Sequence, residues 1–456
     1  MRKHMIRLLL ISAILSLTAC EGGLLYKSPP EPVREPAPAK TKLVYWSGDT
    51  HDTEYIKPLI ERFNETNPDR IEVNYITRGS DYTQAVDIGF ASGQAPDVLR
   101  VKENSIQLYY KKGYLAPLDA YMSEEMKTRF PAIDGYNRFG GQRYSLPNFG
   151  ATMRLIYNKE LFAKAGIAGP PATLEELVDT ARKLTVAGKA EGAYGFALNF
   201  KSPQSAFDRS ARAIAEMSGY GGFGFDFRSG RFDFGGYRQI VEAFKRIKDQ
   251  GSMLPGVESL DMDPLRAQFA AGKIGMYMSY SAEPGVYRTQ FPTSLDWAAA
   301  PVPTIDGQVR GASGFLGGQW LAIASSSKHK EQAWKFLSFM YQESLLLGYH
   351  EQGYGISMVP SVIAQASSPQ LKGAEGFLPN AYDGVWPVAP TVTVKGQRFQ
   401  DAFYLYMAEG GDLSQVIEDL NRRYNEGLEQ ARTEGGVQIQ PIPDFDPIKL
   451  AGNYGP

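Results

Sequence analysis

Residues 43–77 read LVYWSGDTHDTEYIKPLIERFNETNPDRIEVNYIT, and this stretch decides the fold class. The apolar run 43–46 predicts a strand, and apolar side chains at helical spacing within 56–63 predict a helix. Asn67-Pro68 ends that helix, and alternating apolar residues over 71–75 predict a second strand. A strand, a helix and a strand in this order indicate a parallel βαβ unit, so we expect an α/β protein.

The same alternation continues along the chain. Residues 97–101 predict a third strand, and a second α/β region is expected from about residue 150. Open parallel sheets bind ligands beyond the carboxyl ends of their strands. In the first region that edge would carry residues 46–49, Arg78 and residues 100–104.

The first 20 residues predict a lipoprotein signal peptide. Basic residues precede an apolar run of 12 residues, 8–19, which is too short to span a bilayer as a helix. Leu17-Thr18-Ala19-Cys20 resembles the bacterial lipobox, in which the cysteine is lipidated, and Cys20 is the only cysteine of the chain. An ordinary secretory signal is the alternative. Two acyl chains on Cys20 would anchor the protein to the extracytoplasmic face of the cell membrane.

Residues 21–40 contain five prolines and predict an extended tether between that anchor and the globular body.

The chain carries 48 Lys+Arg and 50 Asp+Glu, which argues against a strongly basic nucleic-acid binder. One cysteine excludes a disulfide framework, and four scattered histidines form no zinc motif.

Motifs for catalysis and cofactors do not emerge from the sequence. GYGGFG at 219–224 matches a dinucleotide-binding pattern, but that fingerprint requires a following helix, and residues 225–227 predict a strand or turn. A glycosidase would need two carboxylates about 5–10 Å apart. Asp261 with Asp263, or Asp401 with Glu409, would serve, but 50 acidic residues produce such pairs by chance. We expect no enzyme and no cofactor, with a secreted glycosidase as the alternative.

A series of short segments carries a family resemblance through its order and spacing. The segments are QAPDV (94–98), GYLAPLD (113–119), YSLP (144–147), LIYNKELF (155–162), PPATLEEL (170–177), FAAGKIGM (269–276), GGQWLAI (317–323) and KHKEQAWKFL (328–337). Together they resemble the extracellular solute-binding proteins of bacterial ABC importers, in the sugar-binding family 1 that includes maltose-binding protein. The matches span roughly residues 43–360.

This resemblance implies a periplasmic-binding-protein-like type II fold, with two α/β lobes joined by a hinge and the ligand cleft between them. By analogy the crossings lie near 148–151, 301–303 and 349–355. Lobe one would be 41–148 plus 303–352, and lobe two 149–302 plus 353–456. We expect a monomer that closes on its ligand and is then recognised by the permease subunits of an ABC transporter.

The resemblance also implies a carbohydrate ligand, an oligosaccharide above all. A sugar site needs aromatic rings for the apolar ring faces and polar side chains for the hydroxyls. The expected aromatic contacts are Trp46, Tyr280, Trp320 and Trp386, with Trp320 chosen because it adjoins Gly317-Gly318. The expected polar contacts are Asp49, Arg78, Glu103, Asn148 and Glu283. A binding protein for a non-sugar solute such as a polyamine, a metal or a peptide stays open.

Overall fold

The computed structural model describes residues 39–130, 132, 135–318, 320–367, 370–434 and 440–452. The predicted signal peptide, Cys20 and nearly all of the predicted tether lie outside these residues. Lys40–Pro456 form one unit, and the description below concerns that unit. Among the described residues, no helix combines the length and the apolar character needed to cross a membrane.

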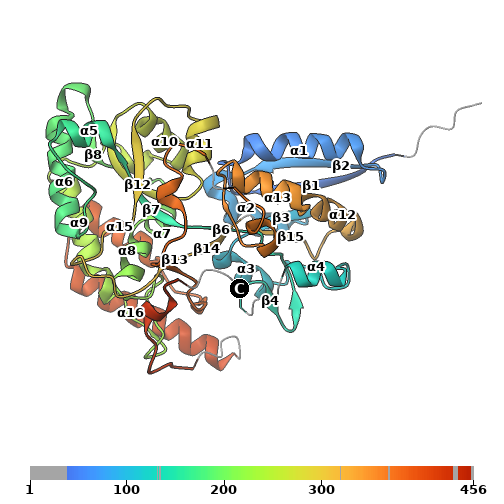
Figure 1. The fold of residues 1–456 in the computed structure, drawn as a ribbon. Helices are drawn as coiled ribbons and strands as arrows, with labels where there is room; N and C mark the ends of the chain where they lie inside the picture. The colour runs from blue at the N-terminus through green and yellow to red at the C-terminus, as the bar shows by residue number, and fades with distance from the viewer. Residues whose placement is uncertain are drawn as a thin grey trace, which may run out of the picture. The chain divides into compact units, whose positions relative to one another are not determined.

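The first sheet has the strand order β15-β3-β1-β2. It consists of β1 (Thr41–Ser47), β2 (Ile71–Thr77), β3 (Val98–Val101) and β15 (Trp320–Ile323). β1 runs parallel to β2 and β3, which confirms the expected βαβ unit, whereas β15 runs antiparallel to β3. Helices α1 (Thr53–Thr66) and α12 (Lys330–Met340) cover one face, and α2 (Tyr82–Ser92) and α3 (Glu103–Lys111) cover the other (Figure 1). We call this sheet with its helices the first lobe.

Helix α1 shows how local sequence builds this lobe. Its buried residues Ile56, Ile60 and Phe63 lie on one face at helical spacing, so the helix packs that face on the sheet. The side chain of Asn67 ends the helix: its amide nitrogen donates to Phe63 O (2.6 Å) and Ile71 O (2.8 Å). Since one side chain satisfies both segments, Asn67 fixes the helix end to the start of β2.

The second sheet has the strand order β12-β7-β11-β8. It consists of β7 (Met153–Asn158), β8 (Tyr194–Phe196), β11 (Ile274–Tyr280) and β12 (Trp297–Ala300). Helix α6 (Leu174–Ala187) begins with the expected capping box of Thr173 and Glu176. Two cores, one on each face, enclose this sheet, and we call the sheet with its helices the second lobe.

The other helices and strands complete the two lobes and their connections. Strands β9 (Phe225–Asp226) and β10 (Arg231–Phe232) follow the glycine-rich residues 219–224, so that segment lacks the helix of a dinucleotide site. The remaining elements are α4 (Glu124–Arg129), β4 (Arg138–Phe139), β5 (Gln142–Arg143), α5 (Lys159–Lys164), α7 (Pro203–Arg209), α8 (Ala211–Met217), β9 (Phe225–Asp226), β10 (Arg231–Phe232), α9 (Arg238–Asp249), α10 (Met262–Ala270), α11 (Glu283–Thr289), β13 (Ser313–Gly314), α13 (Glu343–Glu351), α14 (Pro360–Ile363), β17 (Asp383–Gly384), α15 (Phe399–Glu409) and α16 (Leu413–Thr433).

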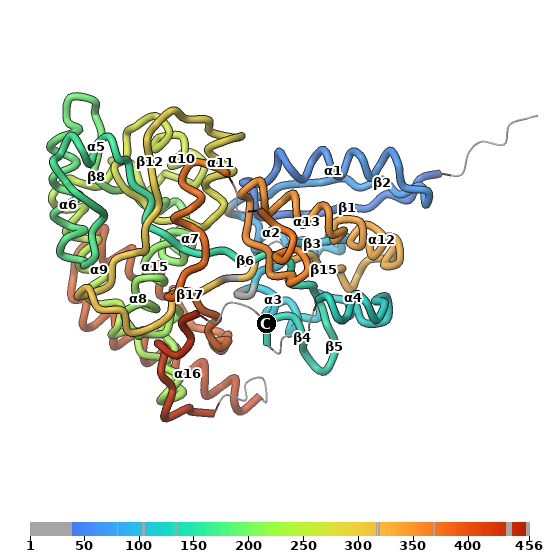
Figure 2. Tube along the Cα trace, viewed as in Figure 1, coloured from blue at the N-terminus to red at the C-terminus, as the bar shows by residue number. Residues whose placement is uncertain are grey.

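A small third sheet lies between the lobes, with β6 (Phe149–Ala151) at its centre (Figures 1 and 2). Its outer strands are β14 (Leu316–Gly318) and β16 (Ile356–Ser357), both antiparallel to β6. Three segments far apart in the sequence therefore meet where the chain passes from one lobe to the other.

The chain passes from the second lobe to the first after residue 303, and back from the first lobe to the second after residue 352. Both crossings therefore lie later in the sequence than expected. Ile305 and Val309 still pack against the core of the second lobe, whereas Phe315 belongs to a core of the first. Val362 belongs to the first lobe and Phe377 to the second. Prolines 301 and 303 interrupt the secondary structure, but the chain stays in the second lobe after them. Thr304, for example, forms a β-bridge with Thr173 of that lobe.

Candidate ligand-binding site

The carboxyl ends of β1 and β3 bring a charged cluster together in the first lobe. Asp49 follows β1, and its Oδ2 lies 3.0 Å from Arg100 Nε in β3. Lys102 Nζ lies 2.7 Å from Asp49 Oδ1. Burial by itself raises the pKa of Asp49, but the charges on Lys102 and Arg100 outweigh burial and hold that pKa well below its usual range. Asp49 is therefore an ionised acceptor at the expected ligand edge.

Arg100 links this cluster to buried polar groups of the first lobe. Its guanidinium donates to both carboxylate oxygens of Asp52, at 3.1 and 3.0 Å, and to Ser47 Oγ at 3.1 Å. Arg100 and Asp52 have almost no exposed surface. The pair therefore has a structural role, positioning Asp49 and Lys102, whose side chain is 41% exposed.

Trp46 and Arg78 lie together at the ends of β1 and β2. Trp46 is buried to 7% exposure in the core that α2 and α3 cover. The guanidinium carbon of Arg78 lies 4.4 Å from the centroid of the Trp46 ring, a cation–π geometry. The ring face that was expected to meet a sugar is thus in contact with an arginine.

Tyr280 ends β11 in the second lobe and is half-buried. Its hydroxyl donates to Asp208 O at 3.1 Å, which fixes the ring. The guanidinium carbon of Arg209 lies 4.6 Å from the ring centroid. The second lobe therefore repeats the pairing of one aromatic ring with one arginine.

Glu283 is enclosed within the second lobe. It has no exposed surface and accepts from Arg266 at 2.7 Å, Ser279 Oγ at 2.6 Å and Tyr277 OH at 3.1 Å. Burial raises the pKa of Glu283, but the adjacent Arg266 charge more than offsets burial and the net pKa is lowered. The Glu283 carboxylate thus has its hydrogen-bond partners within the chain.

Trp320 also lies in the interior, with no exposed surface, and its Nε1 donates to Phe149 O at 3.2 Å. Gly317 was expected to mark a ligand contact at Trp320, but its missing side chain has another role. A Cβ on Gly317 would lie 2.0 Å from Trp320 Cζ2, so the missing side chain makes room for the indole.

Trp386 is buried to 6% exposure, donates from Nε1 to Ala312 O at 2.8 Å and packs against Phe227 and Phe445. Asn148 precedes β6 and lines a cavity of about 20 Å³, which has room for a water molecule. Glu103 begins α3 directly after Lys102, which is the position expected for it, and its side chain lies outside the described parts.

The structure thus brings Asp49, Arg78 and Trp46 together at one edge and places Tyr280 at the corresponding edge of the other lobe. It adds Lys102 and Arg209, which were not singled out from the sequence. Lys102 stands beside the expected Glu103 and within the expected edge 100–104, so its position was a usable signal. Arg209 ends a helix and reaches β11 only through the fold.

The lobes touch on two sides of this region. On one side Thr50 Oγ1 donates to Asp263 Oδ2 at 2.9 Å. On the other, Tyr136 OH donates to the backbone oxygen of Trp386 at 2.6 Å. Both contacts join groups far apart in the sequence, so they are available to stabilise one arrangement of the lobes.

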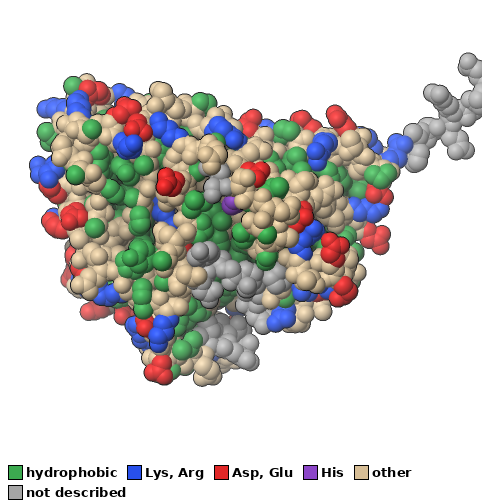
Figure 3. Space-filling model, viewed as in Figure 1, with side chains coloured by type: hydrophobic (Ala, Val, Ile, Leu, Met, Phe, Trp, Pro, Cys, Tyr) green, Lys and Arg blue, Asp and Glu red, His purple; other side chains and the backbone are tan. Residues whose placement is uncertain are grey.

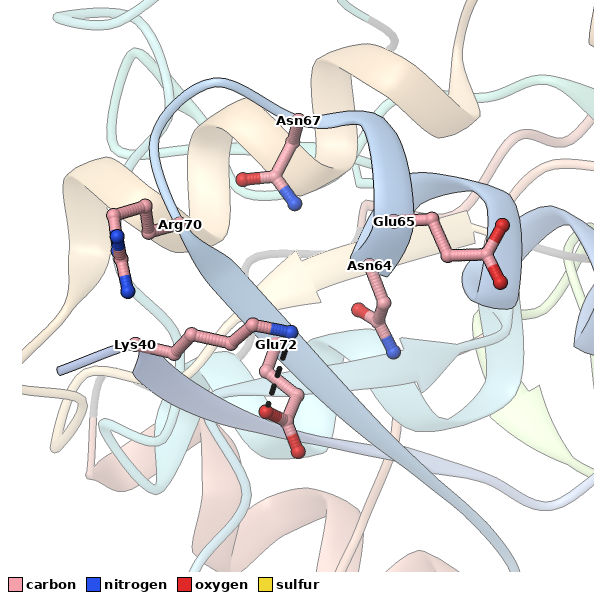
Figure 4. Close-up of a pocket in the computed structure, with 6 residues that line it drawn as sticks. All are labelled: Lys40, Asn64, Glu65, Asn67, Arg70 and Glu72. Carbon is pink, nitrogen blue, oxygen red and sulfur yellow. Dashed lines mark ion pairs between the residues drawn. The ribbon is translucent and has the colours of Figure 1, made fainter. Parts of the chain in front are cut away.

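An open hollow of about 630 Å³ lies elsewhere, at the amino ends of β1 and β2 (Figure 4). Lys40 and Glu72 form an ion pair of 3.7 Å there. The amides of Asn64 and Asn67 bond to the backbone of β2 and its approach. Four of the six lining residues therefore have partners within the chain, and Glu65 and Arg70 complete the lining. The described residues contain no group of side chains suited to a metal ion.

Comparison with known proteins places this arrangement in a family. Over 298 residues the chain is 28% identical to a binding protein of Brucella abortus, covering 63% of this chain and 69% of that one. Over 344 residues it is 24% identical to the maltotriose-binding protein of Pyrococcus abyssi, covering 73% and 69%. A structure from work on xylan utilization by Caldanaerobius polysaccharolyticus superposes with a TM-score of 0.70 at 20% identity, covering 84% and 100%.

Such structural neighbours have the type II binding-protein fold, and the two lobes described above agree with it. The match to a family model is the decisive finding, because it spans residues 47–344 and so more than half of the chain. The chain belongs to the family of bacterial extracellular solute-binding proteins.

Proposed function

We propose that this protein captures an oligosaccharide outside the cytoplasm and delivers it to the permease of an ABC transporter. The observation that supports the proposal is the composition of the strand ends in the two lobes, near which Thr50 contacts Asp263. Asp49 and Lys102 offer an ionised acceptor and a donor in the first lobe, and Tyr280 offers a ring in the second. Sugar hydroxyls need hydrogen-bond acceptors and donors, and the apolar faces of sugar rings need aromatic rings. The Pyrococcus relative, a maltotriose-binding protein, supports a carbohydrate.

The proposed site consists of Asp49, Arg78, Lys102, Tyr280 and Arg209, with Trp46 as the support of Arg78. Glu103 and Asn148 remain in the proposal by their positions after β3 and before β6. Trp320, Trp386 and Glu283 are buried with partners of their own, and we assign them to the frame of the protein. The site contains no proposed catalytic group, and the ligand leaves it chemically unchanged.

Closure of the lobes is the proposed mechanism. The strands β6, β14 and β16 would act as the hinge, with crossings near residues 148–151, 310–316 and 363–374. A ligand that contacts both lobes favours the closed arrangement only by its extra affinity for that arrangement. The contacts of Thr50 with Asp263 and of Tyr136 with Trp386 would add to it.

Lipidation of Cys20 and a tether over residues 21–40 complete the proposal. They would hold a monomeric binding protein close to the permease in the membrane, as a cell-surface or periplasmic lipoprotein. A stable anchor requires at least two acyl chains on that cysteine.

Thermal unfolding of the full chain in detergent, with a panel of mono- and oligosaccharides, tests the function. A ligand present at about 100 times its Kd adds roughly 2.7 kcal/mol to stability, which gives a measurable rise in Tm. The expected result is a rise with one class of oligosaccharide, and recovery of that oligosaccharide intact by chromatography. A cleaved oligosaccharide would indicate a glycosidase instead. A Tm that no carbohydrate changes would contradict the proposal.

A further inference from the structure

Two arginines at the proposed site differ from the interior arginines in their partners. The interior arginines each lie within 3.0 Å of a carboxylate oxygen, in the pairs Arg100–Asp52, Arg154–Asp383, Arg212–Glu216 and Arg266–Glu283. Arg78 and Arg209 form no such pair with any side chain that the structure describes. A partly buried cation that has no carboxylate in direct contact is costly, so these two positions need an explanation.

Arg78 directly follows β2 and is half-buried. Its guanidinium carbon lies over the Trp46 ring, and its Nε is buried without a hydrogen-bond partner. A guanidinium held by its face keeps its edge of N–H donors for a planar anion. Such an edge binds a carboxylate or a phosphate through two parallel hydrogen bonds.

Arg209 lies in the second lobe and is the last residue of α7. It donates to two neutral oxygens, Ser279 Oγ at 3.1 Å and Ser205 Oγ at 3.3 Å. The Tyr280 ring holds its guanidinium as the Trp46 ring holds that of Arg78. These hydroxyl groups orient the guanidinium, and its charge interacts with that of Glu283 through the shared Ser279 rather than in a direct ion pair.

Three described carboxylates of these two regions are bonded to other groups. Asp49 is bonded to Lys102 and Arg100, and Glu283 is bonded to Arg266. The Asp208 carboxylate accepts from Gln400 at 3.2 Å. On the face of the molecule that Figure 3 shows, positive and negative side chains are mixed.

We propose, on the basis of the function proposed above, that the ligand is an acidic carbohydrate. Arg78 in the first lobe and Arg209 in the second bind its anionic groups, and the adjoining rings of Trp46 and Tyr280 hold the two guanidinium groups in place. A carboxylate on the sugar and a phosphate on the sugar present the same planar pairs of oxygens, so both sources satisfy this chemistry.

Isothermal titration of the full chain with trigalacturonate, glucose 6-phosphate and maltotriose tests the ligand class. We expect one acidic ligand to bind at least about tenfold more tightly than maltotriose, which is about 1.4 kcal/mol. Added salt should weaken the acidic ligand alone. Preference for trigalacturonate assigns a carboxylate, and preference for glucose 6-phosphate assigns a phosphate. Tighter or equal binding of maltotriose overturns this inference and leaves the proposed function standing. Binding of none of the three overturns the inference, while the wider carbohydrate panel above decides the function.

Variants test the two residues. Arg78→Gln and Arg209→Gln should each lower the affinity for the acidic ligand about tenfold, or about 1.4 kcal/mol, and lower the affinity for a neutral sugar by a smaller factor. Arg182→Gln, which removes an exposed arginine paired with Asp179 on α6, should change neither. Arg78→Lys and Arg209→Lys keep the charge and should recover only part of the affinity, and they replace the glutamine variants if those fail to fold. Unchanged acidic affinity in the folded variants overturns the assignment.

Discussion

Arg154 donates to both carboxylate oxygens of Asp383, at 2.9 and 2.6 Å, and thereby joins β7 to the distant strand β17. Both side chains are almost completely buried. The same guanidinium also donates to the backbone oxygens of Gly376 and Leu378. One arginine therefore fixes the segment that returns from the first lobe to the second.

Asp383→Ala should consequently destabilise the protein strongly. Removing one partner of a buried ion pair leaves the other charge buried alone, at a cost of about 3–5 kcal/mol. Denaturant unfolding followed by circular dichroism measures this loss. The matched control is Asp306→Ala, because Asp306 pairs with Arg310 on the surface and solvent screens that pair. Similar losses in the two variants would contradict a structural role for Arg154 and Asp383.

Gly317→Ala should destabilise the protein although it adds one methyl group. The new Cβ would lie 2.0 Å from Trp320 Cζ2, so the indole or the strand must move, at about 1–3 kcal/mol for such overpacking. Gly169→Ala is the control, since nothing lies within 4 Å of a Cβ there. Differential scanning calorimetry compares the two, and equal Tm values would show that the glycine serves another purpose.

Acid should destabilise the protein between about pH 6.5 and pH 4 through His51. Burial lowers the pKa of His51 to about 4, against the effects of Asp52 and Asp49 and together with those of Arg100 and Arg266. Below the unfolded pKa of about 6.5 the unfolded chain binds a proton that the folded chain refuses, so stability falls by up to about 3 kcal/mol.

His51→Gln should make the stability less dependent on pH in that window. His350 has a pKa lowered by burial as well, so part of the slope should remain. Unfolding free energies measured at several pH values provide the comparison. A slope that the substitution leaves intact would exclude His51 as its source.

Thr50→Ala should weaken ligand binding without harming the fold. Its hydroxyl joins the lobes through Asp263, and a typical intramolecular hydrogen bond contributes about 0.5–1.5 kcal/mol net, or about two- to tenfold in affinity. Thr128→Ala removes a hydroxyl that bonds only within α4 and serves as the control. Titration of each variant with the ligand is the measurement, and equal affinities would argue against closure through this contact.

Cys20→Ser should release the protein from the membrane. The hydroxyl of serine does not take the place of the thiol in lipidation, so the anchor would be lost while the globular body is unchanged. Fractionation of cells followed by immunoblotting locates the protein. Retention of the variant in the membrane fraction is the outcome that speaks against a lipid anchor.

The first sheet was predictable where its signals are local. The strands and helix of residues 43–77 follow one another in the chain, and their periodicity alone identifies them. β15 joins the same sheet from residues 320–323, and no local pattern indicates a partner more than 200 residues away. Only the family resemblance linked the two halves of the lobe.

The site was less predictable, because partners decide what a side chain does. Glu283 stands in an expected ligand position, but Arg266 lies on the helix before β11 and binds it. Gly317 indicates that some group approaches the backbone closely, and in the fold that group is the indole ring of Trp320. Arg209 carries no local signal, since its role depends on Ser279 and Tyr280 of β11.

The three strands between the lobes have a consequence for how this gene can be divided. Neither lobe is a continuous stretch, because β15 and α12 return to the sheet that β1 began. A gene fragment that stops before residue 315 encodes an incomplete first core. A fragment that starts after residue 152 encodes the second core together with only part of the first. Exchange of one lobe between relatives therefore needs several recombination joints, so new ligand preferences are reached more readily by changing single side chains at the strand ends.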